Sequence, residues 1–169
     1  MRVVSGRLGG RRIEAPPGSS TRPTTDKVRQ AVFNALGSLG VVEDALVADL
    51  YAGSGALGIE ALSRGAVYCT FVERDREALA ALRSNLKALD LEGVSRVVAG
   101  DAVTAAASLD VDVVFADPPY GADPWEGLLA VVRAPLVVAE SDREVTAPDG
   151  WRVTRSRGYG RTWVTFLER

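Results

Sequence analysis

From residue 45 onward the chain alternates apolar runs with stretches of helical pattern, and this alternation constrains the fold more than any other feature. The apolar runs, rich in β-branched residues, span 45–51, 67–73, 94–99, 111–117 and 136–140. The helical pattern between them is strongest at 76–89. Strands that alternate with helices predict a parallel, doubly wound sheet of the α/β, Rossmann-like class.

The first residues predict structure outside this alternation. Residues 2–15 contain two short β-prone segments around a Gly-Gly turn, which is typical of a small β-hairpin. A linker rich in proline and glycine follows. A helix is then expected to start at 23–25 with a threonine as N-cap and to end at Gly37 or Gly40. We therefore expect a basic N-terminal β-hairpin extension at 1–18.

The last part of the chain predicts two antiparallel strands. Segments 151–154 and 162–167 carry strand-like residues, and glycines at 158–160 join them. Together with the five runs of the alternation, they make a mainly parallel seven-stranded sheet that ends in a C-terminal antiparallel hairpin. The whole of 19–169 is expected to form one domain.

The apolar run at 111–116 leads directly into the motif Asp117-Pro118-Pro119-Tyr120. The two prolines end the strand and hold the next residues in an extended turn. That turn presents a carboxylate, freed carbonyls and an aromatic ring at the edge where open α/β sheets bind ligands. Acceptors for an amino group, placed beside a ring that stacks on its base, suit a reaction at a planar exocyclic amine.

The net charge of −2 hides a strong asymmetry along the chain. Residues 1–36 carry seven basic side chains against two acidic ones, and 151–169 carry five against one, so residues 37–150 have a net charge of −11. Surface charge of this kind is often only solvated. Two basic ends on an acidic body, combined with the proline motif, favour a nucleic-acid partner held by the ends.

The cysteine and histidine content limits the available chemistry. Cys69 is the single cysteine, which permits no internal disulfide and suits a reducing cytoplasm. The chain has no histidine, so it lacks the usual general base and the commonest metal ligand. Neither a signal peptide nor a membrane span is visible in the sequence. We expect a cytoplasmic protein without metal or membrane contact, and a monomer because no long amphipathic seam requires a dimer.

The loop at 53–58, Gly-Ser-Gly-Ala-Leu-Gly, matches the glycine fingerprint of nucleotide-binding βαβ units. It lies between a predicted strand and a predicted helix, where glycines permit a tight turn and close approach of a ligand. By itself the loop is compatible with a dinucleotide, with another adenosyl ligand or with a tight turn alone.

Three carboxylates at successive strand ends sharpen the prediction. Glu73 can accept both ribose hydroxyls of an adenosyl ligand, although a solvated carboxylate at a strand end would look the same. Asp101 can accept a hydrogen bond from the amine of an adenine, although it also fits a helix N-cap. Asp49 precedes the glycines, where it disfavours a pyrophosphate but attracts the sulfonium and ammonium of S-adenosylmethionine. The expected cofactor-binding residues are Asp49, Tyr51, Ala52, Gly53, Ser54, Gly55, Glu73, Arg74, Asp101, Ala102 and Asp117.

With these motifs the chain resembles the class I S-adenosylmethionine-dependent methyltransferases that modify exocyclic amines. More narrowly, it is similar to the bacterial 16S ribosomal RNA (guanine-N2) methyltransferase family. The resemblance covers nearly the whole chain and is most specific at 21–29 with 33–34, and it includes 49–55, Glu73 and the motif at 117–120. The chain departs from the family pattern after Tyr120, where one brief helix at 125–133 fills a short connection.

The resemblance implies direct methylation of a guanine 2-amino group in small-subunit ribosomal RNA. The Asp117 carboxylate and the Pro118 carbonyl would hold the amine, Tyr120 would stack on a flipped or unpaired base, and Asp117 would accept the departing proton. The expected catalytic residues are Asp117, Pro118, Pro119 and Tyr120. The residues expected to contact RNA phosphates are Arg2, Arg7, Arg11, Arg12, Arg22, Lys27 and Arg29.

Three other functions fit parts of this pattern. A DNA adenine-N6 methyltransferase also acts on an exocyclic amine, but 169 residues leave little space for a target-recognition region. A nicotinamide-dependent oxidoreductase would explain the glycine loop and leave the proline motif unexplained. A non-catalytic RNA-binding assembly factor would keep the fold and lack turnover, although every motif residue is intact.

Overall fold

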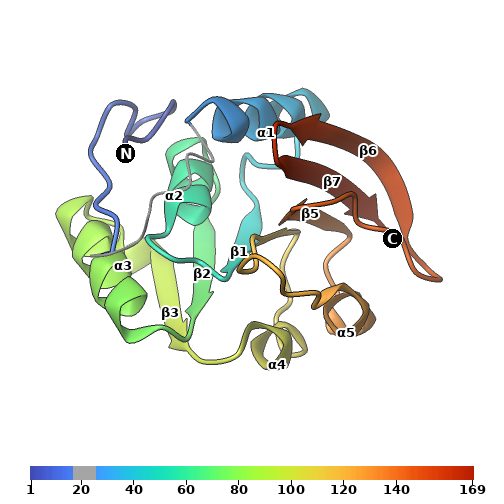
Figure 1. Cartoon of the computed structure of the whole chain (residues 1–169). Helices are drawn as coiled ribbons and strands as arrows, with labels where there is room; N and C mark the ends of the chain where they lie inside the picture. Colours follow the sequence, from blue (N-terminus) through green and yellow to red (C-terminus); the bar gives the residue numbers. More distant parts are fainter. Residues whose placement is uncertain (17–25) are drawn as a thin grey trace.

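The computed structural model describes residues 1–16 and 26–169, and within them a central sheet is covered by helices on both faces (Figure 1). In chain order the elements are α1 (Asp26–Leu39), β1 (Leu46–Leu50), α2 (Ala56–Ser63), β2 (Tyr68–Glu73), α3 (Arg76–Ala88), the 3-10 turn η1 (Glu92–Val94), β3 (Ser95–Ala99), α4 (Ala102–Ala106), β4 (Val113–Ala116), α5 (Trp125–Val131), β5 (Leu136–Ser141), β6 (Arg152–Tyr159) and β7 (Thr162–Glu168).

The sheet has the strand order β3-β2-β1-β4-β5-β7-β6. Strands β1 to β5 run parallel to one another, whereas β7 is antiparallel to both β5 and β6. This confirms the predicted seven-stranded, mainly parallel sheet with an antiparallel end. The connection after β6 carries β7 back between β5 and β6, so β7 lies inside the sheet and β6 forms its edge.

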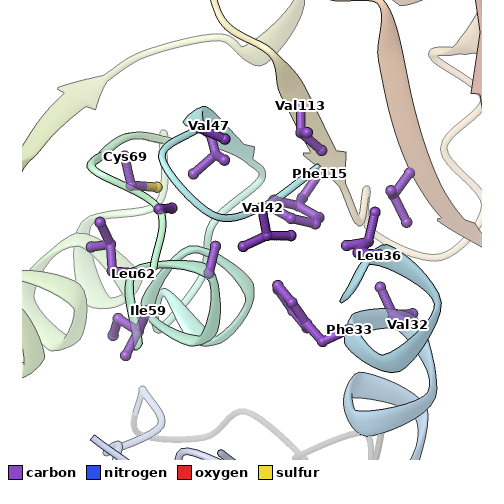
Figure 2. Packing of buried hydrophobic residues seen from close by; sticks show 14 of the residues in the cluster. Val32, Phe33, Leu36, Val42, Val47, Ile59, Leu62, Cys69, Val113 and Phe115 are labelled. Atoms are coloured by element: carbon purple, nitrogen blue, oxygen red, sulfur yellow. The ribbon is translucent and has the colours of Figure 1, made fainter. Parts of the chain in front are cut away.

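Successive side chains of each strand point into two separate cores. The first core packs under the N-terminal segment, α1, α2 and α3, and it takes from the strands Val47, Cys69, Phe71, Val113, Phe115, Leu136, Val138, Val164 and Phe166. The second packs under α4 and α5, and it takes Ala48, Leu50, Val72, Val114, Ala116, Val137, Ala139 and Leu167. In Figure 2, Phe33 of α1 faces Phe115 of β4, and their ring centroids lie 5.3 Å apart.

The N-terminal segment folds back on itself less regularly than the predicted hairpin. Its two arms pair at one antiparallel bridge, Arg2 to Arg12, with backbone N–H groups of Val3 and Ile13 donating to the carbonyls of Arg11 and Met1, each at 2.9 Å. Val3, Leu8 and Ile13 are buried in the first core. The segment is therefore part of the hydrophobic interior as well as a carrier of basic side chains.

Helix α2 binds the N-terminal segment through further hydrogen bonds. The Glu60 carboxylate accepts the backbone N–H groups of Val4 at 2.8 Å and Ser5 at 3.0 Å. The Ser63 hydroxyl accepts the N–H of Leu8 at 2.9 Å. Because buried backbone donors need a partner, these bonds fix the segment to α2 in addition to the backbone bonds between its own arms.

The remaining differences from the sequence prediction are small. Helix α4 was not predicted, and it begins directly after Asp101. The predicted helix start at 23–25 and all but the first residue of the predicted linker at 16–20 lie outside the described residues. Within the described part of the chain, no helix is both long and apolar enough to span a bilayer.

Candidate active site

A pocket of about 150 Å³ lies at the carboxyl ends of β1, β2, β3 and β4. This is the edge at which open parallel sheets bind ligands. Eight of the residues predicted from the sequence line it, namely Tyr51, Glu73, Arg74, Asp101, Ala102, Asp117, Pro118 and Pro119. The pocket thus brings together the end of the glycine-loop strand, two of the strand-end carboxylates and the proline motif.

The glycine loop forms the turn between β1 and α2. Gly55 has a φ of +87°, and a Cβ at this position would lie 2.5 Å from Leu82 of α3. A Cβ at Gly58 would lie 2.6 Å from the sulfur of Cys69 on β2. These positions therefore allow the turn and the close packing of α2 on the sheet. Tyr51 also has a positive φ, +61°, a strained conformation that L residues adopt rarely and that is common at ligand sites.

Glu73 holds the glycine loop from the neighbouring strand end. One carboxylate oxygen accepts the N–H of Gly53 at 2.8 Å, and the other accepts the N–H groups of Arg74 at 2.7 Å and Asp75 at 2.8 Å. A carboxylate has about four acceptor sites, so a ligand hydroxyl can still bind. Glu73 is thereby fixed in place while it lines the pocket.

Asp49 lies behind the loop and does not line the pocket. Its side chain is 2% exposed and accepts the N–H of Gly58 at 2.8 Å in the first turn of α2. Burial raises the pKa of the Asp49 carboxyl well above its usual range, the Gly58 N–H opposes that rise, and the Asp117 and Glu73 carboxylates add to it. Asp49 thus acts on the pocket through the conformation of the loop and through its field.

Replacing Asp49 by asparagine is expected to stabilise the protein at neutral pH. Because folding raises the pKa of this carboxyl above its ordinary value of 3.8, the folded state binds the proton more tightly and loses stability as the pH rises through that window. The asparagine oxygen can still accept the Gly58 N–H without carrying a charge. Asp49→Asn should raise Tm by about 3 °C or more at neutral pH, and the difference should shrink toward pH 3.8.

Thermal melts across this pH range check the expectation. Asp112→Asn is the matched control, because the Asp112 carboxylate accepts the backbone N–H of Leu46 at 2.8 Å but is exposed. That control should change Tm little at any pH. A wild-type protein that melts at the same temperature as Asp49→Asn at neutral pH would show that the buried charge costs nothing.

Asp101 is the N-cap of α4, which was the alternative role considered for it, and it also lines the pocket. Its carboxylate caps α4 by accepting the N–H of Thr104 at 2.8 Å and the Thr104 hydroxyl at 2.9 Å. These bonds lower the pKa of Asp101, so the group stays charged where it faces the pocket. Gly100 and Val72 also line the pocket and were not predicted.

The proline motif contributes three residues to the lining of the pocket. Asp117 is half-buried, Pro118 is buried and Pro119 is exposed. Tyr120 is 52% exposed and lies with the prolines and Ser141 at a shallow depression beside the pocket. The motif therefore offers a carboxylate inside the pocket and an accessible aromatic ring at its rim.

The predicted RNA-contacting residues divide into exposed and buried groups. Among the described ones, those exposed to solvent are Arg2, Arg7, Arg11, Arg12 and Lys27. Arg11 also donates to the Ala88 carbonyl at the end of α3, at 3.0 Å. Arg22 lies outside the described residues.

The prediction that Arg29 contacts phosphate is wrong. Its side chain is only 3% exposed, and its guanidinium pairs with Asp26 at 2.7 Å and with Glu60 at 3.5 Å. A buried guanidinium that is already paired cannot reach a phosphate. Arg29 therefore joins α1 to α2 and the N-terminal segment.

Asn85 of α3 is a support of the site that sequence reasoning missed. Its amide donates to the Ser54 carbonyl at 3.0 Å and to the Glu14 carbonyl at 2.9 Å, and its oxygen accepts the Glu14 N–H at 2.9 Å. One side chain therefore links the glycine loop to the N-terminal segment. The sequence did contain a signal for this role: Asn85 follows Leu82 by three residues and so places a polar amide on the apolar stripe of the predicted helix.

Comparison with known proteins agrees with this geometry. The chain matches the family described as Conserved hypothetical protein 95 over residues 1–168. It is 41% identical over 184 residues to YlbH of Bacillus subtilis, covering 100% of this chain and 99% of the relative. It is 34% identical over 181 residues to the ribosomal RNA small subunit methyltransferase D of Escherichia coli (strain K12), covering 100% and 90% of the two chains.

A solved structure extends the similarity to the fold. The Escherichia coli protein yhhF superposes with a TM-score of 0.86 at 35% identity, covering 100% of this chain and 97% of that chain. The family resemblance predicted from the motifs is thereby confirmed. The chain belongs to the Conserved hypothetical protein 95 family, the methyltransferase family that includes ribosomal RNA small subunit methyltransferase D.

Proposed function

We propose that this protein uses S-adenosylmethionine to methylate the exocyclic N2 amine of a guanine in 16S ribosomal RNA. The observation that carries the proposal is the position of Asp117 and Pro118. They form one wall of a pocket whose other walls are Glu73 and Asp101. A motif suited to grip an amine thus faces carboxylates suited to hold an adenosyl group.

The residues of the pocket fit the methyl donor. Glu73 keeps acceptor capacity for a ribose hydroxyl, and Asp101 keeps a charged carboxylate at the end of β3. A Cβ built on Gly53 meets no atom within 4 Å, so the loop backbone is open to a ligand. S-adenosylmethionine supplies an electrophilic methyl group on a sulfonium. The negative field of the pocket suits that cation and disfavours a pyrophosphate.

The chain's own residues position the acceptor amine. The Asp117 carboxylate and the Pro118 carbonyl accept its two hydrogens, which aims the nitrogen lone pair into the pocket. Tyr120 stacks on the base, a contact worth about 1–3 kcal/mol. Asp117 then takes the departing proton, directly or through water, so the reaction requires no histidine.

The exposed arginines of the N-terminal segment fit an RNA substrate. Arg2, Arg7 and Arg12 lie on a segment fixed to α2, so they present charge from a defined position. Such side chains bind phosphates without reading the sequence. A base inside a duplex cannot reach the pocket, so the target is flipped out or unpaired.

Labelled methyl transfer tests the proposal. The purified protein is incubated with labelled S-adenosylmethionine and with undermethylated small ribosomal subunits or duplex DNA, and the labelled nucleoside is identified after digestion. We expect N2-methylguanosine from the subunits. Label in N6-methyladenine would move the protein to the DNA class, and measurable cofactor binding without any label would indicate a binder without turnover.

A further inference from the structure

The edge strand β6 carries a row of basic and aromatic side chains on one face of the sheet. Arg155 pairs in register with Phe166 and Arg157 with Val164, and both partners belong to the first core. Because side chains alternate along a strand, Arg155, Arg157 and Tyr159 share the face that α1 covers. Tyr159 packs against that core, whereas the two arginines are exposed.

The arginines of this row, together with Arg161 in the turn that follows β6, carry charge that pairs with no carboxylate of the described residues. Arg155, Arg157 and Arg161 are exposed, and none of them forms an ion pair with a carboxylate in the described part of the chain. Arg152, at the other end of β6, does pair with Glu168 at 3.3 Å. The Arg157 guanidinium carbon lies 5.4 Å from the centre of the Tyr159 ring. The row therefore combines uncompensated positive charge with a flat stacking surface.

The register of the sheet places this row level with the proline motif. Ala116, which precedes Asp117, pairs with Ala139 of β5, and the next residue, Glu140, pairs with Val164. Val164 in turn pairs with Arg157. Asp117 and Arg157 are thus three strand spacings apart, roughly 14 Å. The turn at 160–161 lies at the same edge of the sheet as the pocket.

The other basic region, the N-terminal segment, lies on the same face of the sheet at the opposite end. The N-terminal segment buries Val3, Leu8 and Ile13 in the first core, next to α2 and α3. In Figure 1 this segment and the β6–β7 hairpin lie at opposite ends of the molecule. A polyanion that reaches the pocket can therefore meet positive charge on both sides.

We propose that Arg155, Arg157 and Arg161, with Tyr159, form a second RNA-binding surface that holds the strand flanking the target base. The arginines bind phosphates, and the Arg157–Tyr159 surface accepts a stacked base. This inference rests on the proposed function for the identity of the polyanion. It gives β6 a role in RNA binding that is separate from the lining of the pocket.

The test measures RNA binding directly and without methyl donor. A short single-stranded RNA is titrated with the double variant Arg155→Gln/Arg157→Gln at several salt concentrations. The affinity is expected to fall about tenfold, and the slope of log K against log salt is expected to decrease by about 1.4, since each lost phosphate contact in a single strand accounts for about 0.7. In the methylation assay the same variant should raise KM for RNA and leave kcat unchanged.

The matched control removes the same charge from the other face. Arg96 pairs with Thr70 on the side of the second core, Arg133 follows α5, and both are exposed. Arg96→Gln/Arg133→Gln should bind RNA like the wild type. Equal affinity and equal slope for the β6 variant and the wild type would overturn the proposal, as would an equal loss in both double variants.

The two levels of inference fail separately. If the wild type methylates no RNA, and if the β6 variant binds RNA more weakly than both the wild type and the control variant, the proposed activity is wrong and the proposed RNA-binding surface is supported. Methylation by the wild type with unchanged KM and RNA affinity in the β6 variant would support the activity and remove the surface. Matching Tm values for both variants and the wild type establish that the fold is intact.

Discussion

Replacing Asp117 by alanine is expected to lower the single-turnover rate of RNA methylation by at least about 100-fold. The substitution removes the group that orients the amine and accepts its proton. Asp117 lies in a loop after β4 and is only half-buried, so the fold should persist. The affinity for the methyl donor, measured by direct titration, should fall by a much smaller factor, because the other predicted cofactor-binding residues of the pocket remain. Retained turnover in Asp117→Ala would contradict the role given to the motif.

Asp117→Asn separates positioning from proton transfer. Asparagine keeps an oxygen that accepts a hydrogen bond, but it cannot take up the proton at neutral pH. If positioning accounts for most of the rate, this variant should be faster than Asp117→Ala. If proton uptake by the carboxylate limits the reaction, the two variants should be equally slow, and only the wild-type rate should fall as the pH is lowered.

The second large effect is expected at Glu60, whose removal should destabilise the protein by about 3–5 kcal/mol. Glu60 is fully buried, and its carboxylate lies 2.7 Å from the Arg64 guanidinium and 3.5 Å from that of Arg29. It also accepts the N–H groups of Val4 and Ser5. Glu60→Ala leaves a buried guanidinium and two backbone donors without this partner. Urea denaturation of the variant and the wild type measures the loss.

Asp26→Ala is the matched control for Glu60. It removes the other carboxylate bound to Arg29, but the Asp26 side chain is 61% exposed. An exposed ion pair contributes little, so this change should cost less than about 1 kcal/mol. Equal losses for Asp26→Ala and Glu60→Ala would mean that burial does not set the strength of this network.

Because of the same network, the RNA-binding role of the N-terminal segment has to be tested by point substitutions and not by deletion. The segment supplies Val3, Leu8 and Ile13 to the core and satisfies Glu60. Deleting it would remove buried apolar surface and expose the outer face of α2, so lost activity would not report on RNA contacts. Substitutions of the exposed Arg7 or Arg12 leave the core intact and report on charge alone.

The sheet was predictable because its physical signal is local. A strand buried on both faces reads as a continuous apolar run, as β1, β2, β4 and β5 do. The five runs identified in the sequence correspond to β1 to β5, although β3, at the edge of the sheet, is only partly buried. Helix α4 escaped because its five residues are too few to show a helical period. The strand-end residues Glu73, Asp101 and Asp117 were predicted to meet because parallel strands bring their carboxyl ends to one edge.

What the sequence could not show is which polar groups satisfy one another across the fold. Arg29 was counted with the exposed arginines, although its spacing to Val32, Phe33 and Leu36 places it on the apolar stripe of α1. The buried Glu60 carboxylate of another helix, together with Asp26, makes such a buried charge tolerable. Asp49 was likewise assigned to the cofactor, whereas the fold directs it to α2.

The interior position of β7 also fixes the order in which the sheet can be completed during synthesis. β6 leaves the ribosome before β7, yet its strand partner is β7, and β5 also waits for β7 to cover its open side. Until Thr162–Glu168 have emerged, the nascent chain exposes an unpaired strand edge of the kind that invites aggregation. Closure of the sheet is therefore a late event that requires β7.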